Sequence, residues 1–266
     1  MKKIKAVIFD WAGTLVDFGS IAPVQVFVEV FAAHGLAVTT QEVRSHMGLA
    51  KKDHLNALLQ MDRIATAWQE VHGTAAGVQD VDIMYEELTP KLTELVSKFA
   101  APIDGIPELL LALRSEGIKI GSTTGYVEEM MAEILPIAEA QGIKIDAVVN
   151  SSECLEGRPS PFMIFRNMEK LGLYHADEII KVGDTVADMH EGVNAGTWTV
   201  GITTSGNEIG LSKEAWDVLS KETQDKLKNQ AADRLIDSGA HFVIHDLRNL
   251  PSIIEEINAI LEYPEN

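Results

Sequence analysis

Short apolar segments that alternate with helical patterns constrain the fold of this chain more than any other feature. The run Ile4–Phe9 ends abruptly at Asp10, and Gly13 soon breaks the pattern, as expected where a buried strand enters a loop. Further strands are predicted at Ile118–Thr123, Asp146–Val149, Ile179–Val182, Trp198–Ile202 and His241–Ile244. Helical patterns at Pro107–Glu116 and Glu128–Gln141 precede the first two of these. This alternation predicts an α/β fold, a doubly wound, Rossmann-like parallel sheet with helices on both faces.

The alternation is interrupted between about residues 18 and 100, where helical patterns occur without a convincing strand. Ligands of open α/β sheets bind at the carboxyl ends of the strands, so a helical insertion after the first strand would lie above the site. We therefore predict an α/β core domain of residues 1–17 and 101–266 and an all-helical cap domain of residues 18–100.

Three local features are expected within this cap. The segment Val24–Ala33 has only two polar residues, which share one narrow side of a helix, so this helix is expected to be buried on more than one side. Thr40 is predicted to be the N-cap of the next helix. A further helix is predicted over Ile83–Phe99, with Pro90 as a kink or break.

Charge and cysteine content narrow the possible partners and location. The 22 Lys and Arg residues against 40 Asp and Glu give a formal net charge of -18, and such a field repels nucleic acids and anionic membrane surfaces. An anionic substrate would therefore need a local cation or metal ion. The single cysteine, Cys154, excludes an internal disulfide and fits the reducing cytoplasm. Since no apolar stretch approaches the ~18 residues of a membrane span, we expect a cytoplasmic protein without nucleic-acid or membrane partners.

Polar residues stand at the ends of three predicted strands. Asp10 and Asp184 each follow a buried apolar segment, where a carboxylate is costly unless something pairs with it. Two carboxylates at neighbouring strand ends offer oxygen ligands for Mg²⁺. Thr124 and Gly125 offer a hydroxyl and a close backbone approach to phosphate oxygens, and Arg158 would supply a fixed positive charge. Taken alone, Arg158 is also typical of a surface residue.

These residues resemble the motifs of the haloacid dehalogenase superfamily, and the resemblance spans nearly the whole chain. The motifs are Asp10-Trp11-Ala12-Gly13-Thr14, Ser122-Thr123-Thr124-Gly125, Arg158-Pro159 and Gly183-Asp184-Thr185-Val186-Ala187-Asp188. The resemblance implies that Asp10 is a nucleophile that forms an aspartyl-phosphate and that Thr124 binds the phosphoryl group. It also implies a Mg²⁺ site of Asp10, Asp184 and the backbone carbonyl of Ala12, with Asp188 acting through a metal-bound water. Taken alone, Asp184 and Asp188 also fit helix N-caps.

Ala12 departs from the usual superfamily pattern. Phosphatases and phosphomutases of the superfamily usually have a second Asp there, because a departing alkoxide needs a general acid at neutral pH. Alanine cannot supply that proton. Either the protein is inactive or its leaving group needs no such acid.

Lys51 makes a carbon leaving group possible. Its amine can condense with an aldehyde to an iminium, and cleavage of a phosphorus–carbon bond beside the iminium gives a neutral enamine. Met47, Lys51 and His54 fall on one helical face, whereas Lys52 points about 100° away. Like-charge repulsion from Lys52 is expected to lower the pKa of Lys51, which leaves more free amine. The alternative is a solvated Lys-Lys pair on a cap helix.

The alanine and the cap lysine together resemble the phosphonoacetaldehyde hydrolase (phosphonatase) family. The matching segments are Phe9–Gly13, Met47–Leu49 with Lys51 and Asp53-His54, Gly121–Tyr126, Gly157–Pro159 and Lys181–Asp184. The resemblance implies that Lys51 forms a Schiff base, that His54 and Tyr126 are polar helpers and that Met47 lines the site. Trp11 would flank the substrate. Taken alone, His54 also fits a surface helix, and Tyr126 and Trp11 also fit packing positions.

The resemblance implies hydrolysis of phosphonoacetaldehyde to acetaldehyde and phosphate, with Mg²⁺ as cofactor and a mobile cap. It also implies a homodimer joined through the caps, and the apolar helix at Val24–Ala33 would suit that interface. Two alternatives stay open: a phosphate-ester phosphatase or phosphomutase that tolerates Ala12, and a non-catalytic phospho-ligand sensor. The polar, mainly helical segment Ile209–Ser238 receives no function from the sequence.

Overall fold

A computed structural model describes residues 2–262 and contains one parallel sheet of six strands. The strands are β1 (Ala6–Phe9), β2 (Lys119–Thr124), β3 (Ala147–Asn150), β4 (Ile179–Gly183), β5 (Trp198–Ile202) and β6 (Phe242–Ile244). Their order is β3-β2-β1-β4-β5-β6, and every neighbouring pair is parallel. The predicted doubly wound α/β fold is confirmed. The limits of β5 are those predicted, and those of the other strands differ from the predicted ones by at most two residues.

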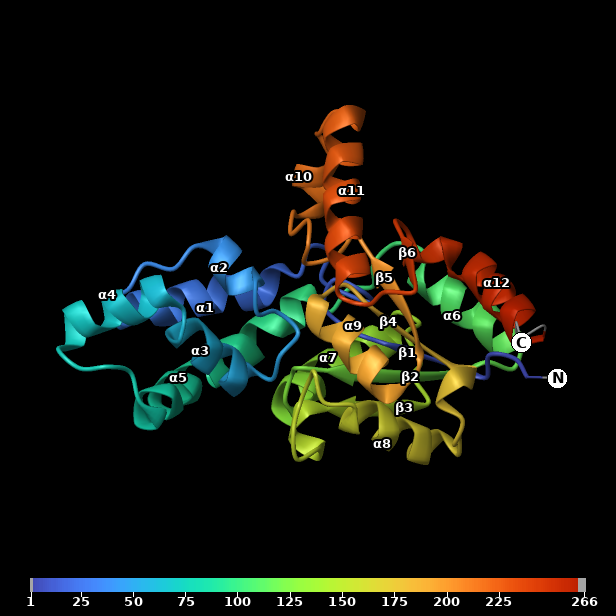
Figure 1. The fold of residues 1–266 in the computed structure, drawn as a ribbon, viewed down its shortest axis with the longest axis horizontal. Helices are drawn as coiled ribbons and strands as arrows, with labels where there is room; N and C mark the ends of the chain where they lie inside the picture. Colours follow the sequence, from blue (N-terminus) through green and yellow to red (C-terminus); the bar gives the residue numbers. More distant parts are fainter. Residues whose placement is uncertain (1, 263–266) are drawn as a thin grey trace.

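Helices cover both faces of this sheet. They are α6 (Ile106–Ser115), α7 (Glu128–Ala140), α8 (Phe162–Leu171), α9 (Val186–Ala195) and α12 (Leu250–Glu262). α8 packs on β2 and β3, and α9 packs on β4 and β5. α6 and α12 lie on the opposite side of the sheet from α8 (Figure 1). Strand residues alternate between the two sides, so that Val7 and Phe9 of β1 join one hydrophobic cluster and Ala6 and Ile8 join the other.

A helical cap is inserted between β1 and β2. Its helices are α1 (Ile21–Ala33), α2 (Thr40–Arg44), α3 (Lys51–Leu59), α4 (Asp62–His72) and α5 (Val78–Val96). They lie beyond one end of the sheet (Figure 1), and residues 18–100, all of which are described, contain no strand, as predicted. The chain leaves and re-enters the core at one place, where Val16 pairs with Pro102 and the Ile103 N–H donates to the Leu15 carbonyl at 2.9 Å.

α1 is the buried helix of the cap and begins three residues before the predicted start. Most of its apolar side chains, Phe27 and Phe31 among them, are buried, while Gln25 and Glu29 are exposed. The prediction of burial on more than one side is therefore confirmed. α1 packs against α5 within the same chain, so most of the apolar surface of α1 is buried inside the cap.

The N-cap of α2 is Thr39 rather than the predicted Thr40. The Thr39 hydroxyl accepts a hydrogen bond from the Glu42 N–H at 3.1 Å, and the Glu42 carboxylate accepts one from the Thr39 N–H at 2.8 Å. This reciprocal pair is a capping box, which requires Thr and Glu three residues apart. The spacing from Thr39 to Glu42 satisfies it, whereas Thr40 has no carboxylate three residues later.

α5 is longer than predicted at its start, and Pro90 neither ends nor breaks it. The helix begins at Val78 instead of Ile83, and a short 3₁₀ turn follows it at Ser97–Phe99. Proline removes one backbone hydrogen bond and crowds the preceding turn. The helix continues because Pro90 lies on the exposed side, while the buried residues on either side of it, such as Leu88 and Leu92, pack in the cap.

The first linker between core and cap has an unusual backbone. Asp17 and Ser20 have φ of 54° and 49°, in the left-handed region that non-glycine residues rarely adopt. The Asp17 carboxylate accepts hydrogen bonds from the N–H groups of Ile21 and Ala22, both at 3.0 Å, and burial raises its pKa to about 6. Asp17 thereby fixes the direction in which α1 leaves the core.

The polar segment Ile209–Ser238, which precedes the last strand, forms two helices between β5 and β6. It contains α10 (Lys213–Asp217) and α11 (Lys221–Asp237). In Figure 1 α11 projects outward from the sheet, while its buried residues Ala231 and Leu235 lie in the part of the helix that packs on β5 and β6. Trp216 of α10 is buried, and Arg234 of α11 pairs with Glu208. No helix within residues 2–262 is both long and apolar enough to cross a membrane.

We expect Thr39→Ala to lower the free energy of unfolding by about 1 kcal/mol, because the substitution removes the hydroxyl of the capping box. Urea denaturation followed by circular dichroism measures this change. Thr40→Ala is the matched control, and its unfolding free energy should equal the wild-type value or rise slightly, since alanine is the better helix former. Equal losses from both substitutions would contradict the assignment of Thr39 as the N-cap.

Candidate active site

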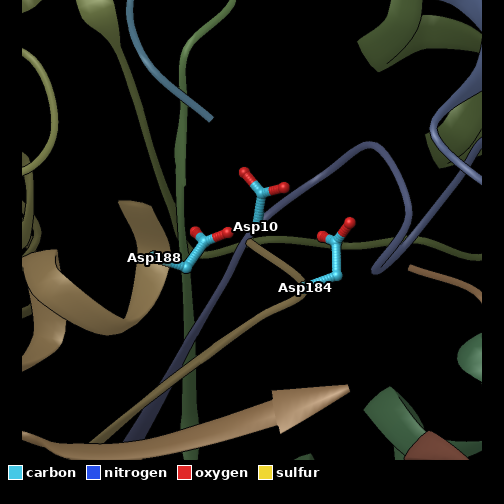
Figure 2. A group of neighbouring side chains, drawn as sticks. All are labelled: Asp10, Asp184 and Asp188. Atoms are coloured by element: carbon cyan, nitrogen blue, oxygen red, sulfur yellow. The ribbon is translucent and has the colours of Figure 1, made fainter. Parts of the chain in front are cut away.

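Three carboxylates converge at the carboxyl end of the central strands. The chain diverges there, since β1 and β4 are neighbours from which it winds outward in opposite directions, and such a switch point forms a crevice. Asp10 follows β1, Asp184 follows β4, and Asp188 lies in the first turn of α9. Figure 2 shows the three carboxylates facing one another, and one oxygen from each lies within 4.8 Å of the others.

Local contacts orient Asp184. One carboxylate oxygen accepts a hydrogen bond from the Thr14 hydroxyl at 2.7 Å, and the other accepts one from the Asn207 N–H at 2.8 Å. Gly13 has a φ of +85°, and a Cβ there would lie 2.2 Å from the Asp184 carboxylate, so only glycine fits this close approach. Asp184 is not a helix N-cap, because Thr185 holds that position at the start of α9.

Asp188 belongs to the capping box of the same helix. One of its oxygens accepts hydrogen bonds from the Thr185 hydroxyl at 2.6 Å and N–H at 3.2 Å. Its other oxygen lies 2.8 Å from the Lys181 ammonium and 3.1 Å from the Arg158 guanidinium. Because two cations already balance its charge, Asp188 is better placed to act on an ion indirectly than to bind it.

Arg158 lies at the centre of the site and not on the surface, with only 2% of the residue exposed. One guanidinium nitrogen donates to the Asp10 carboxylate at 2.7 Å and to the Thr123 carbonyl at 2.8 Å. Another donates to the Glu191 carboxylate at 2.9 Å. The planar fork of arginine suits such divergent acceptors, and it fixes the guanidinium beside the predicted nucleophile.

Lys181 and Glu191 complete this buried network. The sequence analysis quoted Lys181 only as part of a matching segment, without a role, and did not name Glu191. Lys181, in the middle of β4, donates to the Thr123 hydroxyl at 2.8 Å and lies 3.2 Å from the Glu191 carboxylate. Two sequence signals could have found them. A lysine inside an otherwise apolar strand must have a partner, and Glu191 follows Asp188 by three residues on the same face of α9.

The network carries an excess of negative charge. Four carboxylates and two cations give a net charge of −2 when all six are ionised. The groups counted are Asp10, Asp184, Asp188, Glu191, Arg158 and Lys181. Asp184, the carboxylate without a cation in contact, is fully buried, and burial together with Asp10 and Asp188 holds its pKa well above the ordinary value. A divalent cation would balance this excess, and oxygen ligands of this type suit Mg²⁺. The donor set therefore fits a magnesium ion.

Lys51 reaches the site from the cap, at the first position of α3. It is 3% exposed, and its ammonium lies 4.9 Å from the centre of the Tyr126 ring. Burial lowers the pKa of Lys51 to about 8, with the Asp10 carboxylate opposing this shift and Arg158 adding to it. The prediction that Lys52 lowers the pKa of Lys51 was wrong, because Lys52 is exposed and pairs with Asp82.

Most of the predicted site residues line one small cavity of about 20 Å³. They are Asp10, Ala12, Met47, Lys51, Thr124, Gly125, Tyr126 and Arg158. Four further residues line it that the sequence analysis did not select: Ser20, Pro23, Gly48 and Thr185. Ser20 and Pro23 enter the site because the left-handed linker turns the start of α1 toward Asp10, a feature that no local sequence pattern shows.

Trp11 and His54 lie outside this cavity. Trp11 is fully buried in the main hydrophobic cluster. His54 is also fully buried, so it is not a surface helix residue. One of its ring nitrogens lies 2.7 Å from the Val43 carbonyl, and its ring lies 4.1 Å from that of Phe27. The structure thus places both side chains in packed surroundings behind the cavity wall.

Cap and core meet closely enough to close the site. A Cβ on Gly125 of the core would lie 2.4 Å from the Leu49 carbonyl of the cap, and one on Gly48 would lie 2.4 Å from the Thr185 hydroxyl. A cavity of about 20 Å³ has room for little more than a water molecule. The cavity therefore has no room for a larger ligand while cap and core lie as they do in this structure.

A larger cavity of about 710 Å³ lies at the hinge between cap and core. Residues of both linkers line it, among them Phe18 and Phe99, together with Trp216. It contains none of the converging carboxylates or Lys51, so the small closed cavity is the site that carries the chemistry.

Comparisons with known proteins agree with this geometry. Residues 4–196 match the family model of haloacid dehalogenase-like hydrolases. The phosphonoacetaldehyde hydrolase of Bacillus cereus (strain AH187) is 45% identical over 255 residues, which cover 96% of this chain and 97% of that protein. This chain belongs to the phosphonoacetaldehyde hydrolase family of the haloacid dehalogenase-like hydrolases. The family member of Paraburkholderia xenovorans (strain LB400) is 43% identical and covers 98% of both chains.

A solved structure extends the family likeness to three dimensions. The phosphonoacetaldehyde hydrolase-like protein of Oleispira antarctica superposes with a TM-score of 0.96 at 39% identity, over 99% of this chain and 95% of that one. The agreement covers cap and core together, so the arrangement of the two parts is shared within the family.

We expect Asp184→Asn to raise the melting temperature of the metal-free protein and to abolish its stabilisation by Mg²⁺. The amide relieves the excess of buried negative charge, and the Thr14 hydroxyl can accept a hydrogen bond from it. A bound ion at a hundredfold excess over its Kd should add about 2.7 kcal/mol to the wild type. Thermal unfolding with EDTA or excess MgCl₂ measures both effects. Asp246→Asn is the control, and a full Mg²⁺ response in Asp184→Asn would contradict the assignment.

Proposed function

We propose that this protein hydrolyses the carbon–phosphorus bond of phosphonoacetaldehyde to acetaldehyde and phosphate. One observation carries the proposal: Lys51 and Asp10 line the same closed cavity, and Ala12 stands beside them where an acid would be needed for an oxygen leaving group. A lysine amine and a carboxylate can then act on the two ends of one small molecule that carries both an aldehyde and a phosphonate.

Lys51 acts first in the proposed sequence. Its neutral amine adds to the aldehyde carbon, and uptake of a proton with loss of water gives an iminium with nitrogen bound to the former carbonyl carbon. The lowered pKa of about 8 supports this role, because a larger fraction of the amine is neutral near physiological pH than for an ordinary lysine. The position of Lys51 in the cap means that imine formation links the substrate to the moving domain.

Asp10 then attacks phosphorus. The carbon–phosphorus bond breaks, and its electron pair moves into the iminium to give a neutral enamine, while the phosphoryl group becomes bound to the Asp10 carboxylate. The enamine needs no proton in order to leave, which is consistent with alanine at position 12. Arg158 holds Asp10 at 2.7 Å and, with Thr124, offsets charge on the phosphoryl oxygens.

Two hydrolytic steps complete the catalytic cycle, one at the aspartyl-phosphate and one at the imine. Attack on the aspartyl-phosphate returns Asp10 and releases phosphate. Protonation of the enamine at carbon regenerates an imine, and its hydrolysis releases acetaldehyde and the free Lys51 amine. Closure of the cap keeps bulk water from the phosphoryl group until the carbon–phosphorus bond has been cleaved.

We assign Mg²⁺ as the cofactor. Asp10, Asp184 and the backbone carbonyl of Ala12 would hold the ion, and Asp188 would act through a bound water. The net charge of −2 in the buried network supports this assignment. The ion would supply positive charge where negative charge collects on the phosphoryl oxygens.

The geometry favours this function over the two alternatives. A phosphatase or phosphomutase needs an acid at the position of Ala12 to protonate its oxygen leaving group, and alanine cannot supply one. A phospho-ligand sensor would not need the Asp10 nucleophile or a buried amine at Lys51. No feature of the site favours either alternative over cleavage of a phosphonate.

We also propose a homodimer joined through the caps, and the cytoplasm as the location. The family resemblance supports the dimer, whereas α1 gives it little support, because most of the apolar side chains of this helix are buried within the chain. Light scattering that gives only the mass of one chain would remove the dimer. Cys154, a free thiol, is in keeping with a reducing compartment.

We expect Lys51→Arg to lower phosphate release from phosphonoacetaldehyde by about three orders of magnitude or more, the scale seen when a group essential to covalent catalysis is lost. Arginine keeps the positive charge but cannot form the imine. The assay compares phosphonoacetaldehyde with a generic phosphate ester in the presence of Mg²⁺. Lys52→Arg, on the exposed neighbour, is the matched control. Turnover of the ester that is unaffected by Lys51→Arg would instead make the protein a phosphatase.

The pH dependence follows from the same amine. The pKa of Lys51 is lowered to about 8, so the neutral fraction grows as pH rises and levels off above 8. We expect kcat/KM to fall about tenfold per pH unit below pH 8 in this account. Steady-state assays between pH 6 and pH 9 measure the profile. A rate that stays flat from pH 6 to pH 8 would argue against a titrating lysine amine.

A further inference from the structure

Arg44, at the end of α2 in the cap, makes contacts to the core that the proposed mechanism does not use. Its guanidinium donates to the carbonyls of Gly19 and Gly210 at 2.9 and 3.0 Å and to the side-chain oxygen of Asn207 at 3.1 Å. The Asn207 amide returns a hydrogen bond to the Arg44 carbonyl at 3.2 Å. One cap side chain is thus fastened both to the linker and to a core loop.

The core loop that receives Arg44 is the loop that orients Asp184. It comprises residues 203–210, which follow β5. The Asn207 N–H donates to the Asp184 carboxylate at 2.8 Å, and a Cβ on Gly206 would lie 2.6 Å from the Cβ of Asp184. The same loop closes around Arg44, since a Cβ on Gly210 would lie 2.5 Å from its guanidinium. Asn207 therefore touches the cap and the metal site at once.

The loop is braced so that a change at one end reaches the other. Two internal hydrogen bonds hold it, from the Gly206 N–H to the Thr203 carbonyl and from the Gly210 N–H to the Gly206 carbonyl at 2.9 Å. On its outer side, Arg234 of α11 donates to the Glu208 carboxylate at 2.6 Å. The helical excursion before β6 thereby anchors this loop, which gives that segment a structural role.

We propose that Arg44 and Asn207 form a latch that couples closure of the cap to binding of the metal ion at Asp184. With the latch made, the loop presents its N–H to Asp184 and holds the cap segment 45–51, which leads directly to Lys51. Opening the cap withdraws Arg44 and frees the loop. Because coupling is reciprocal, an ion at Asp184 favours the closed cap as much as closure favours the ion.

Arg44 is a positioning residue in this account, because it touches neither substrate nor reacting atoms. Lysine at this position would keep the charge, which isolates geometry from electrostatics. A single ammonium cannot reach acceptors on the linker, on Asn207 and on Gly210 at the same time. Asn207→Ala cuts the same link from the core side and leaves the backbone N–H that Asp184 uses.

Hydrogen–deuterium exchange of the full-length protein, with and without saturating MgCl₂, tests the latch. The reporters are the amides of residues 45–51, of which Ser45 and Met47 are hydrogen-bonded in the closed cap. In the wild type we expect Mg²⁺ to slow their exchange at least about fivefold. In Arg44→Lys and Asn207→Ala the effect should fall below about twofold, and calorimetry should show Mg²⁺ affinity weakened about fivefold. Arg63→Lys is the matched control, since Arg63 pairs with Glu42 within the cap.

The double variant sharpens the test. Substitutions that cut one link should weaken Mg²⁺ binding no further when combined, whereas independent effects add. Full Mg²⁺ protection of residues 45–51 in either single variant, additive losses, or a wild type that binds Mg²⁺ without this protection would overturn the latch. The inference rests on the proposed metal site but not on which bond is cleaved. A wild type that binds no Mg²⁺ would remove the metal site and the latch together, and the assay with phosphonoacetaldehyde stays independent of this result.

Discussion

A buried cluster of ionised side chains at one edge of the sheet is the constraint on which the site depends. Asp10 and Asp184 lie at the ends of adjacent strands, and the desolvation of carboxylates so close together would be prohibitive without compensating charge. Arg158 and Lys181 supply part of it from within the fold, and the remaining excess calls for a divalent cation. Removing one partner would leave an unpaired buried charge, so the network fixes its own geometry. Asp10, the proposed nucleophile, is held in place for that reason.

The two groups on which the proposed mechanism depends come from different domains, Asp10 from the core and Lys51 from the cap. In the proposed mechanism the core holds the phosphoryl end of the substrate through its strand ends, whereas Lys51 belongs to the cap and lines the same cavity as Asp10. Burial is also the main cause of the lowered pKa of Lys51, so the contact between cap and core leaves more of this amine in the neutral form that the proposed mechanism needs. Close glycine contacts at Gly48 and Gly125 make this approach possible.

Sequence patterns predicted the parts of this structure that depend on local order. Strand and helix periodicity gave the doubly wound sheet and the helical insertion, and the motif residues at strand ends led to most of the cavity lining. Periodicity did not show the capping box at Thr39 or the continuity of α5 through Pro90, because capping geometry and tertiary packing decide these. The sequence analysis did not find Arg44 and Asn207, because these two residues are 163 positions apart in the chain and meet only in the folded structure. Lys52 was given an influence on Lys51 that its exposed side chain does not have.

The central claim is that Lys51 forms a covalent imine with the substrate. Borohydride reduction of the protein during turnover of phosphonoacetaldehyde, followed by peptide mass spectrometry, tests it most directly. The account predicts an ethyl group on Lys51 and none on the exposed neighbour Lys52, because the reduced imine of acetaldehyde leaves two carbons on the reacting nitrogen. Phosphate release without a reduced adduct on Lys51, or equal labelling of Lys51 and Lys52, would contradict it.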